Sequence, residues 1–318
     1  MNNLNQGDEM SLDRLSSFLR KKSMLKTTYM YRIQKHVFYM EAENGDQLIL
    51  KRHNNRLRVE HQWHFFDRQT CSFIVPFRRF PNDKRFLIDN GYCWTISPYI
   101  PGRKLNYASP GDRAASLRTL QTFHTETKGI RINRPFRKEL FYQRWYNRLQ
   151  RFKNTEHLFK QLGFATLFLN IVQTTEHQLQ ELAHSPLSNL ENESLKTGIW
   201  IHGDVASHNF IRYDGHVFMI DFDLLTCTSG IYDYIQLGQR FLPYLDWDLN
   251  RLMSYKMVHE KHLKLWLDAI LLPSDIMREW LHYINGNSSR LAHDYLTELE
   301  TNWNKRQSFL KMVQTVLN

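Results

Sequence analysis

Two strand-like segments that meet at Asp214-Gly215 place the strongest constraint on the fold of this chain. The segments read NFIRY and HVFMI, and an Asp-Gly pair between two such segments is a strong signal for a two-residue hairpin turn. Pairing around this turn places Tyr213 opposite His216. The sequence therefore predicts a β-hairpin in the second half of the chain.

The open end of this hairpin gathers side chains that carry oxygen atoms. Extending the pairing brings Asn209 opposite Ile220, so Asn209 and Asp221 are expected at the same end. The loop 202–208 precedes the first strand and brings Asp204 near that end. Amide and carboxylate oxygens suit Mg²⁺, a hard cation that usually completes its shell with phosphates and water. We therefore interpret the segment as a metal-assisted site.

Strand and helix signals earlier in the chain supply a lysine and a glutamate. Residues 29–51 are rich in aromatic and β-branched side chains around an Asn-Gly turn, which predicts paired strands that end on Lys51. The next segment, RLRVEHQWHFF, has apolar residues at helical spacing, with Glu60 on the turn beside them. A helix that carries a carboxylate therefore follows a strand that carries a lysine.

Near residue 100 the spacing of apolar residues changes from the period of strands to that of helices. Ser109 is followed by a proline and an acidic residue, a pattern typical of a helix start. In the later segment SDIMREWLHYI, either Ser274 or Asp275 is a candidate N-cap. We expect an α+β fold of two lobes: an antiparallel sheet with one helix in residues 1–100, and a mainly helical lobe in residues 101–318 that contains the hairpin.

Phosphoryl transfer requires few protein groups, and this chain offers all of them. The reaction needs a metal to neutralise phosphate charge, a cation on the phosphates and a carboxylate that orients the attacking hydroxyl. Asp204 would orient or deprotonate the hydroxyl, while Asn209 and Asp221 would bind Mg²⁺. Lys51, held by Glu60, would contact the phosphates of the nucleotide. The order and spacing of these residues together carry this interpretation, because any one of them alone would be weak.

These motifs resemble those of a known superfamily. The segments HGDVASHN and MIDFD are similar to the catalytic and metal loops of the aminoglycoside phosphotransferase and choline kinase superfamily, whose fold is similar to that of protein kinases. LILKR and LQTFHTETKG agree with this resemblance. GIYDYIQLGQRFLP and LDWD resemble most closely the spore-coat-associated kinase-like branch found in endospore-forming bacteria. The resemblance begins at about residue 29 and is strongest over residues 198–248.

The resemblance implies an ATP- and Mg²⁺-dependent phosphotransferase that acts on a hydroxyl of a small molecule. It implies that residues 1–100 form a nucleotide-binding lobe and residues 101–318 a catalytic and substrate lobe. It gives Asp204, Asn209, Asp221, Lys51 and Glu60 the same roles as above. Further acidic positions that match the superfamily are Asp223 and Asp233, as supporting residues. We expect His202 to bond the loop backbone, and the backbone groups of the hinge to face adenine, at Trp94, Thr95, Ile96 and Ser97.

One departure from the superfamily favours an alternative function. The superfamily often has a glycine in the first hairpin, where backbone amides cover the nucleotide phosphates, and KSMLKTTYMYRIQKHVFYM has none. Ser23, Thr27 or Thr28 are candidate substitutes as donors. The alternative is a catalytically weak or inactive kinase-like structural protein, such as a spore-coat component.

The charge of the chain favours anionic partners. Its formal net charge is +10, and no RRM, KH or zinc pattern accompanies it, which argues against nucleic-acid binding. Aminoglycosides are cationic and generally need acidic pockets, so the charge argues against a resistance enzyme unless the second lobe is locally acidic. Four arginines are spaced to share one helical face, as the solvated side of an amphipathic helix or as a site for an anionic acceptor or polyanion: Arg137, Arg144, Arg148 and Arg151.

The chain carries no sequence signal for a membrane or for secretion. The longest apolar stretch, FATLFLNIV, is far shorter than the roughly 20 residues that span a bilayer, and the first residues lack an apolar region followed by a cleavage site. The three cysteines form no CxxC pair and are expected to be core thiols in a reducing compartment. We therefore expect a soluble, cytoplasmic protein, with spore association as an alternative location.

Overall fold

The computed structural model describes residues 12–132, 141–286 and 290–317. Contacts group these residues into two compact units. The first unit takes its described residues from 1–104, 130–136 and 209–223, and the second takes them from 105–129, 137–208 and 224–318. The sequence-based division placed the boundary at residue 100 and the hairpin in the second lobe. The contacts instead place the hairpin 209–223 in the first unit.

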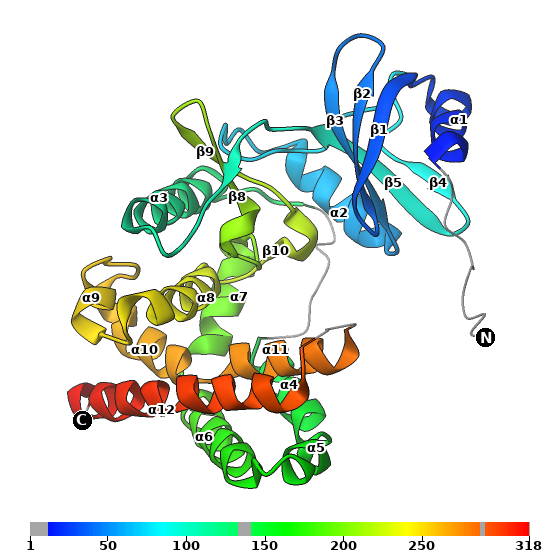
Figure 1. Ribbon diagram of the computed structural model, residues 1–318. Helices are drawn as coiled ribbons and strands as arrows, with labels where there is room; N and C mark the ends of the chain where they lie inside the picture. Colours follow the sequence, from blue (N-terminus) through cyan, green and yellow to red (C-terminus); the bar gives the residue numbers. More distant parts are fainter. Residues whose placement is uncertain (1–11, 133–140, 287–289, 318) are drawn as a thin grey trace, which may run out of the picture. The chain divides into compact units, whose positions relative to one another are not determined.

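A five-stranded antiparallel sheet forms the centre of the first unit (Figure 1). Its strands lie in the order β1-β2-β3-β5-β4. The chain passes from β3 to the edge strand β4 and then returns as β5, which lies between them. The turn between the first two strands has only two residues, Lys35 and His36. The strands are β1 (Thr27–Gln34), β2 (Val37–Ala42), β3 (Gln47–His53), β4 (Leu87–Asp89) and β5 (Tyr92–Pro98).

Two helices cover opposite faces of this sheet. Side chains alternate between the faces of a strand, so Trp94 and its neighbour Cys93 point to opposite sides. The helix α1 (Leu12–Ser23) packs with the cluster that contains Trp94. The helix α2 (Arg56–Phe66) packs with Cys93 through Val59 and Trp63. Both faces of the sheet are therefore buried, which fixes the register of β3 and the position of Lys51.

The predicted hairpin is present and belongs to a three-stranded sheet of the first unit. β8 (Phe210–Tyr213) and β9 (His216–Met219) pair as expected, with Tyr213 opposite His216, and β6 (Arg103–Lys104) adds a strand on the β8 side. The backbone of Met219 also bonds to Phe73 (2.7 Å) and Val75 (3.0 Å). These bonds are the physical reason that the hairpin groups with residues 1–104.

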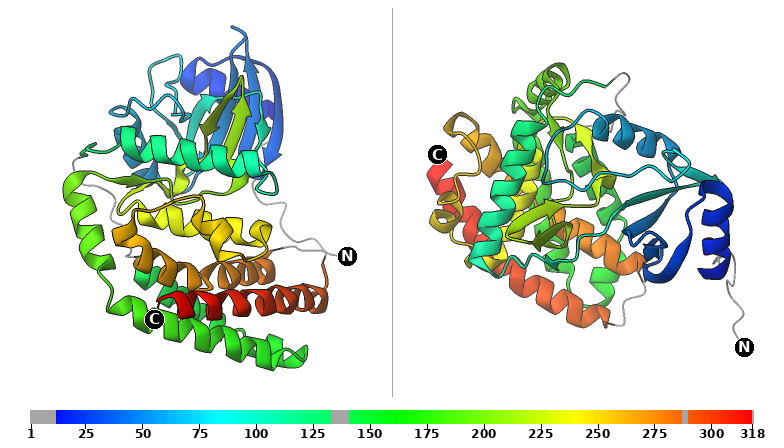
Figure 2. Two further views of the ribbon diagram at one scale, coloured as in Figure 1. Left: turned by 90° about the vertical axis from the view of Figure 1, so that its left-hand side faces the viewer. Right: turned by 90° about the horizontal axis from the view of Figure 1, so that it is seen from above.

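The second unit is mainly helical (Figure 2). Within it, α10 packs against α6, α8 and α12, and α4 packs against α6 and α11. A short antiparallel pair, β7 (Trp200–Ile201) with β10 (Thr226–Cys227), completes it. The helices are α3 (Pro110–Glu126), α4 (Phe141–Lys153), α5 (Glu156–Gln161), α6 (Ala165–Ala183), α7 (Leu187–Thr197), α8 (Ile231–Phe241), α9 (Leu249–Met253), α10 (Leu263–Leu271), α11 (Ser274–Asn285) and α12 (Ala292–Leu317).

The predicted α+β fold, with an antiparallel sheet followed by a mainly helical part, is confirmed. Two local predictions have different outcomes. Ser109 is the N-cap residue of α3, as expected, although its side chain makes no capping bond. The N-cap of α11 is Pro273, so neither Ser274 nor Asp275 caps this helix, because the helical conformation already begins at Ser274.

The cysteines and the helices agree with two further expectations. All three cysteines are buried and none forms a disulfide, as predicted for core thiols. In the described parts of the chain, no helix is both long and apolar enough to cross a bilayer.

Candidate active site

A glycine shapes the loop that follows β7. Gly203 has a φ of +82°, which residues with side chains rarely adopt. A Cβ atom added there would lie 2.6 Å from the backbone oxygen of Leu224. Only glycine therefore allows the chain to turn at this point, and the turn sets the direction in which Asp204 leaves the strand.

A buried carboxylate holds this loop in place. Asp233, on α8, is fully buried and accepts hydrogen bonds from the backbone nitrogens of His202 (2.8 Å) and Gly203 (2.9 Å). The Nε2 atom of His124, on α3, lies 3.0 Å from the same carboxylate. The Nδ1 atom of His202 accepts from the backbone nitrogen of Asp204 at 3.3 Å. Because a buried charge is costly to leave unpaired, these bonds favour a single loop conformation.

The predicted catalytic residue, Asp204, forms an ion pair with an arginine. Its carboxylate lies 2.7 Å from a guanidinium nitrogen of Arg240, on α8. Both side chains are partly exposed and line a cavity of about 420 Å³ within the second unit. Burial is the main cause that lowers the pKa of Arg240; the nearby Arg278 lowers it further, and Asp204 opposes them. Asp204 therefore faces the cavity beside a fixed positive charge.

The hairpin of the first unit positions the two predicted metal ligands. Asp214 and Gly215 both have positive φ, as the tight turn requires. At the other end, the backbone oxygen of Asn209 accepts a hydrogen bond from Ile220 at 3.0 Å, so this predicted pairing is confirmed. Asp221 follows with a φ of +62°. Asn209 is buried and Asp221 is partly exposed.

Lys51 lies at the centre of a charged cluster in the same unit. Its Nζ atom is 2.7 Å from a carboxylate oxygen of Asp221 and 2.8 Å from one of Asp223. Burial by itself would lower the pKa of Lys51, but the two carboxylates outweigh burial and raise it. The lysine is therefore charged at neutral pH, and its ammonium group reduces the repulsion between the two aspartates.

Glu60 does not hold Lys51. Its carboxylate forms an ion pair with Arg56, one turn away on α2, at 2.7 Å. The buried face of α2 instead presents Gln62, whose Nε2 donates to the backbone oxygen of Phe222 at 2.8 Å. The prediction of a Lys51–Glu60 pair was wrong. Glu60 lies two positions before the inward-facing Gln62, so its side chain points about 200° around the helix axis from that of Gln62.

His53 adds a neutral ring to the cluster. Its Nδ1 atom lies 3.7 Å from Asp223, and its Nε2 bonds the hydroxyl of Thr95 at 2.9 Å. Burial is the main cause that lowers the pKa of His53, and the charge of Lys51 contributes, while Asp223 opposes them. His53 therefore acts as a hydrogen-bonding group near neutral pH and adds no charge.

The oxygen donors of the first unit suit a hard cation. Asp221 and Asp223 converge on one point, occupied by the ammonium of Lys51, and Asn209 leads into the same hairpin. Across the part of the chain that the structure describes, no group of three or more His, Cys, Asp or Glu residues is arranged to hold a metal. This set fits Mg²⁺ better than zinc or a protein-caged ion, because Mg²⁺ is commonly held by one or two carboxylates together with phosphates and water.

Most of the backbone groups that were expected to contact adenine pair within the sheet instead. Trp94 pairs with residues of both β3 and β4, and the backbone oxygen of Ile96 accepts from Arg78 at 2.8 Å. Thr95 is buried, and Ser97 lies near the end of β5, opposite Ile49. The hinge prediction was wrong for Trp94 and Ile96, because β5 continues through Pro98 and its pairing uses their backbone groups.

The proposed substitutes for the missing glycine lie at the wrong end of the first hairpin. Ser23 bonds within α1 to Leu19, Thr27 bonds to Ser16, and Thr28 bonds to the backbone of Glu41. The hairpin turn is at Lys35 and His36 instead. These two residues line a cavity of about 470 Å³ in the first unit, whose cationic side chains are Lys35, Lys51, Arg52 and Arg58 and whose carboxylates are Asp221 and Asp223.

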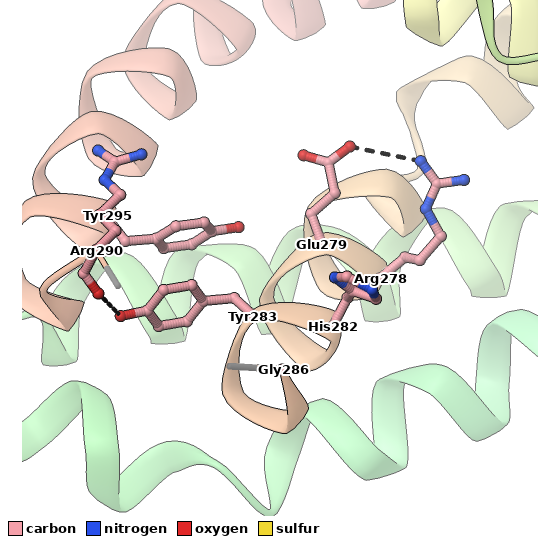
Figure 3. A pocket seen from close by; sticks show the side chains of 7 residues that line it. All are labelled: Arg278, Glu279, His282, Tyr283, Gly286, Arg290 and Tyr295. Atoms are coloured by element: carbon pink, nitrogen blue, oxygen red, sulfur yellow. Dashed lines mark hydrogen bonds and ion pairs between the residues drawn. The ribbon is translucent and has the colours of Figure 1, made fainter. Parts of the chain in front are cut away.

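The basic helix of the sequence analysis is α4, and it contributes to the cavity of the second unit. Arg144 and Arg148 line that cavity, whereas Arg151 is exposed and does not. Arg137 lies outside the described residues. From α11, Arg278 and Glu279 line the same cavity and also the neighbouring one in Figure 3, where their ion pair faces the stacked rings of Tyr283 and Tyr295.

Several residues of the candidate site were not identified from the sequence, among them Gln62, His124 and Arg240. Gln62 is the inward residue of α2, which the helical period of its apolar neighbours could have indicated. His124 lies in the motif LQTFHTETKG, but its bond to Asp233 joins helices 109 residues apart. Nothing in the sequence indicates the pairing of Arg240 with Asp204, because it depends on how α8 packs.

Comparison with known proteins places these features in context. The model of the phosphotransferase enzyme family matches residues 35–248 of this chain. Among curated proteins, none matches the chain by sequence.

Solved structures of similar fold cover almost the whole chain. An aminoglycoside phosphotransferase from Alicyclobacillus acidocaldarius has a TM-score of 0.68 at 16% identity, and the match covers 98% of both chains. An amicoumacin kinase in complex with AMP-PNP, Ca²⁺ and Ami has a TM-score of 0.62 at 14% identity, and the match covers 95% of this chain and 94% of that chain. A choline kinase from Streptococcus pneumoniae has a TM-score of 0.55 at 13% identity, with 95% and 97% covered. At these identities the likeness shows a common fold.

Proposed function

Because the chain belongs to the phosphotransferase enzyme family, we propose that it transfers a phosphoryl group from ATP, bound with Mg²⁺, to a hydroxyl of a small molecule. The observation that carries this proposal is the cluster of Lys51, Asp221 and Asp223, which lines a cationic cavity in the first unit. A lysine for phosphates and carboxylates for a divalent cation are the parts that phosphoryl transfer requires.

Each residue has a role that follows from its chemistry. Lys51 would contact the phosphates, with Lys35 and Arg52 adding positive charge to the same cavity. Asn209 and Asp221 would hold Mg²⁺, which neutralises phosphate charge when it is bound, and Asp223 would support them.

In the second unit, Asp204 would orient the acceptor hydroxyl and take its proton. Its carboxylate is partly exposed to the cavity, and the buried Asp233 fixes the loop that carries it. The ion pair with Arg240 holds the Asp204 carboxylate in one orientation.

The nucleotide side of the proposal has support from similar folds. The amicoumacin kinase structure contains AMP-PNP, and a spectinomycin phosphotransferase structure contains ADP. For this chain we place the adenine contact at the end of β5, from Ser97 onward. Trp94 pairs with strands on both sides, Thr95 is buried, and the backbone oxygen of Ile96 accepts from Arg78.

Two finer expectations remain predictions. A cytoplasmic location agrees with three buried cysteines that form no disulfide. An association with spores rests on the segments GIYDYIQLGQRFLP and LDWD alone. An inactive structural role is not favoured, because a scaffold has no need of a lysine that binds two carboxylates or of a fixed aspartate that faces a cavity.

Thermal unfolding with and without Mg-ATP tests the nucleotide site. Ligand at about 100 times its dissociation constant should stabilise the wild-type protein by roughly 2.7 kcal/mol. The variant Asp221→Ala should lose this shift. Asp83→Ala is the matched control, because Asp83 is also an aspartate of the first unit with positive φ (+65°) but forms a surface pair with Arg79; this variant should keep the shift.

Turnover by Asp204→Asn tests the proposed base. Its rate of phosphoryl transfer should fall by roughly 10²–10⁴-fold, the usual scale for a general base, while the Mg-ATP shift remains. No stabilisation of the wild type at millimolar Mg-ATP would contradict the nucleotide site. Equal turnover by Asp204→Asn would contradict the role of that carboxylate.

A further inference from the structure

The cavity of the second unit has more positive than negative charge in its walls. Four arginines line it, and a fifth, Arg306, forms an ion pair with the cavity residue Asp275 at 2.9 Å. Five guanidinium groups therefore meet the three carboxylates that line the cavity. The other two carboxylates are also paired, Asp204 with Arg240 at 2.7 Å and Glu279 with Arg278 at 3.4 Å.

The arginines converge from three helices. Arg144 and Arg148 are four residues apart on α4 and so project from the same face. Arg240 comes from α8 and Arg278 from α11. Because these helices are far apart in the sequence and pack within one unit, the grouping of the four guanidinium groups is a property of the fold.

Arg148 is the arginine for which the repulsion between the grouped guanidinium charges is clearest. Its Nη1 atom donates to the backbone oxygen of Ser274 at 3.0 Å, and no carboxylate of the described residues forms an ion pair with it. Burial is the main cause that lowers the pKa of Arg148 to about 10. Three further guanidinium groups lower it as well, those of Arg278, Arg144 and Arg151, while Asp275 opposes them. Like charges in a partly desolvated pocket repel one another, and a bound anion would relieve the repulsion.

We propose that the acceptor of this enzyme carries an anionic oxygen group, a phosphate or a carboxylate, which binds Arg148 and Arg278 in this cavity. The proposal rests on the proposed function, because it describes the acceptor of the same reaction. Asp204 lines the same cavity, so one small molecule can place its hydroxyl at Asp204 and its anionic group at the arginines. Guanidinium groups suit this task because their planar fork binds two oxygens of a phosphate or carboxylate at once.

The same charges disfavour cationic acceptors. An aminoglycoside would bring several ammonium groups into a cavity where the three carboxylates already have arginine partners. The second unit is therefore not acidic at the place where a resistance enzyme would need acidity.

Binding of inorganic phosphate, measured by thermal unfolding at constant ionic strength, tests the proposal. Chloride replaces phosphate in the reference, and acetate and the cationic aminoglycoside kanamycin form the other arms. The wild type should be stabilised by phosphate, by acetate or by both, which also separates the two anionic classes. Kanamycin should not stabilise it. Stabilisation by kanamycin and by neither anion would overturn the proposal.

Variants of α4 assign the binding to this cavity. Arg148→Gln should weaken anion binding by about 10- to 100-fold, as expected for the loss of a charge-assisted hydrogen bond. The matched control is Arg151→Gln on the same helix, because Arg151 is exposed and lies outside the cavity, where solvent screens its charge; its anion binding should change far less than that of Arg148→Gln. Arg148→Lys, which keeps the charge, should bind with intermediate affinity and covers the case in which Arg148→Gln fails to fold. Equal binding by the wild type and Arg148→Lys, with no loss in Arg148→Gln, would refute the assignment.

A variant of the first unit separates this proposal from the proposed function. Phosphate can also enter the cationic cavity around Lys51, so the measurement is repeated in Lys51→Met. A phosphate shift that persists in Lys51→Met and disappears with Arg148→Gln supports the acceptor site. If the wild type responds to Mg-ATP but to neither anion, the proposed function stands and the anionic acceptor is wrong. If it responds to an anion through Arg148 but not to Mg-ATP, the proposed function fails first.

Discussion

The ion-pair partners of Lys51 differ from those that the sequence predicted. It binds Asp221 and Asp223, which lie about 170 residues later in the chain, and not the glutamate of the next helix. The nearby Glu60 has a stronger local option, the arginine one turn before it. At the scale of single residues, the site therefore uses the aspartates both to hold the lysine and to supply oxygen ligands.

Replacing the glutamate tests this arrangement directly. Glu60→Gln should leave phosphoryl transfer within about twofold of the wild type and should cost about 0.2–0.5 kcal/mol of stability, the usual value of a helical surface pair. Lys51→Met should reduce the rate by about 10²-fold or more, since it removes a cation aimed at the phosphates. Steady-state kinetics and urea unfolding provide both readouts. If Glu60→Gln is as inactive as Lys51→Met, the glutamate does hold the lysine during turnover.

At the scale of elements, the loop after β7 depends on one glycine, and a second glycine provides its control. Gly203 and Gly163 have nearly the same φ, +82° and +85°, but a Cβ at Gly163 would meet nothing within 4 Å. Alanine at either position should cost about 1–2 kcal/mol for the left-handed backbone. Gly203→Ala should cost about 1–3 kcal/mol more, because it also contacts Leu224.

Urea unfolding and turnover measure the two glycine variants together. Gly203→Ala should also lose turnover, since the turn directs Asp204, whereas Gly163→Ala should keep it. Equal losses of stability in the two variants would mean that the close approach to Leu224 relaxes at little cost and that the backbone conformation alone determines the effect.

The elements of the site were predictable where the signal is local. The Asp-Gly turn gave the hairpin, and the helical spacing around Val59 gave α2, because both depend on residues close together in the sequence. The position of the hinge was missed, since Ile96 pairs with Arg78 and with β3. The orientation of Glu60 was missed because its neighbours are apolar on more than one side and do not define a single face.

At the scale of the whole molecule, each unit is assembled from separated segments of the chain. Residues 209–223 belong by their contacts to the same unit as residues 1–104, although a long helical stretch separates them in the sequence. Sequence reasoning placed the hairpin with its neighbours along the chain, which is the natural expectation when no long-range contact is visible. The net charge of +10 likewise did not show where the positive charges lie, and so it did not indicate that arginines gather around one cavity.

A fragment of the chain tests the discontinuous unit. Residues 1–104 alone would leave Phe73 and Val75 without their backbone partner Met219, and β6 without its neighbour β8. Urea unfolding should show this fragment to be less stable than the same fragment joined by a flexible linker to residues 209–223. Equal stability of the two fragments would mean that the sheet of residues 27–98 folds without any contribution from the hairpin.

The hairpin 209–223 belongs by its contacts to the first unit, but the chain segments directly before and after it belong to the second. This arrangement limits how the genes of related proteins can recombine. A single crossover near residue 104 would join the sheet of one parent to the Asp221–Asp223 segment of another, and so would separate Lys51 from the aspartates that it binds. An exchange that keeps the pair together needs two further junctions, at residues 208 and 223. Recombination can therefore exchange the acceptor cavity between related proteins only when the hairpin 209–223 stays with the sheet of the same parent.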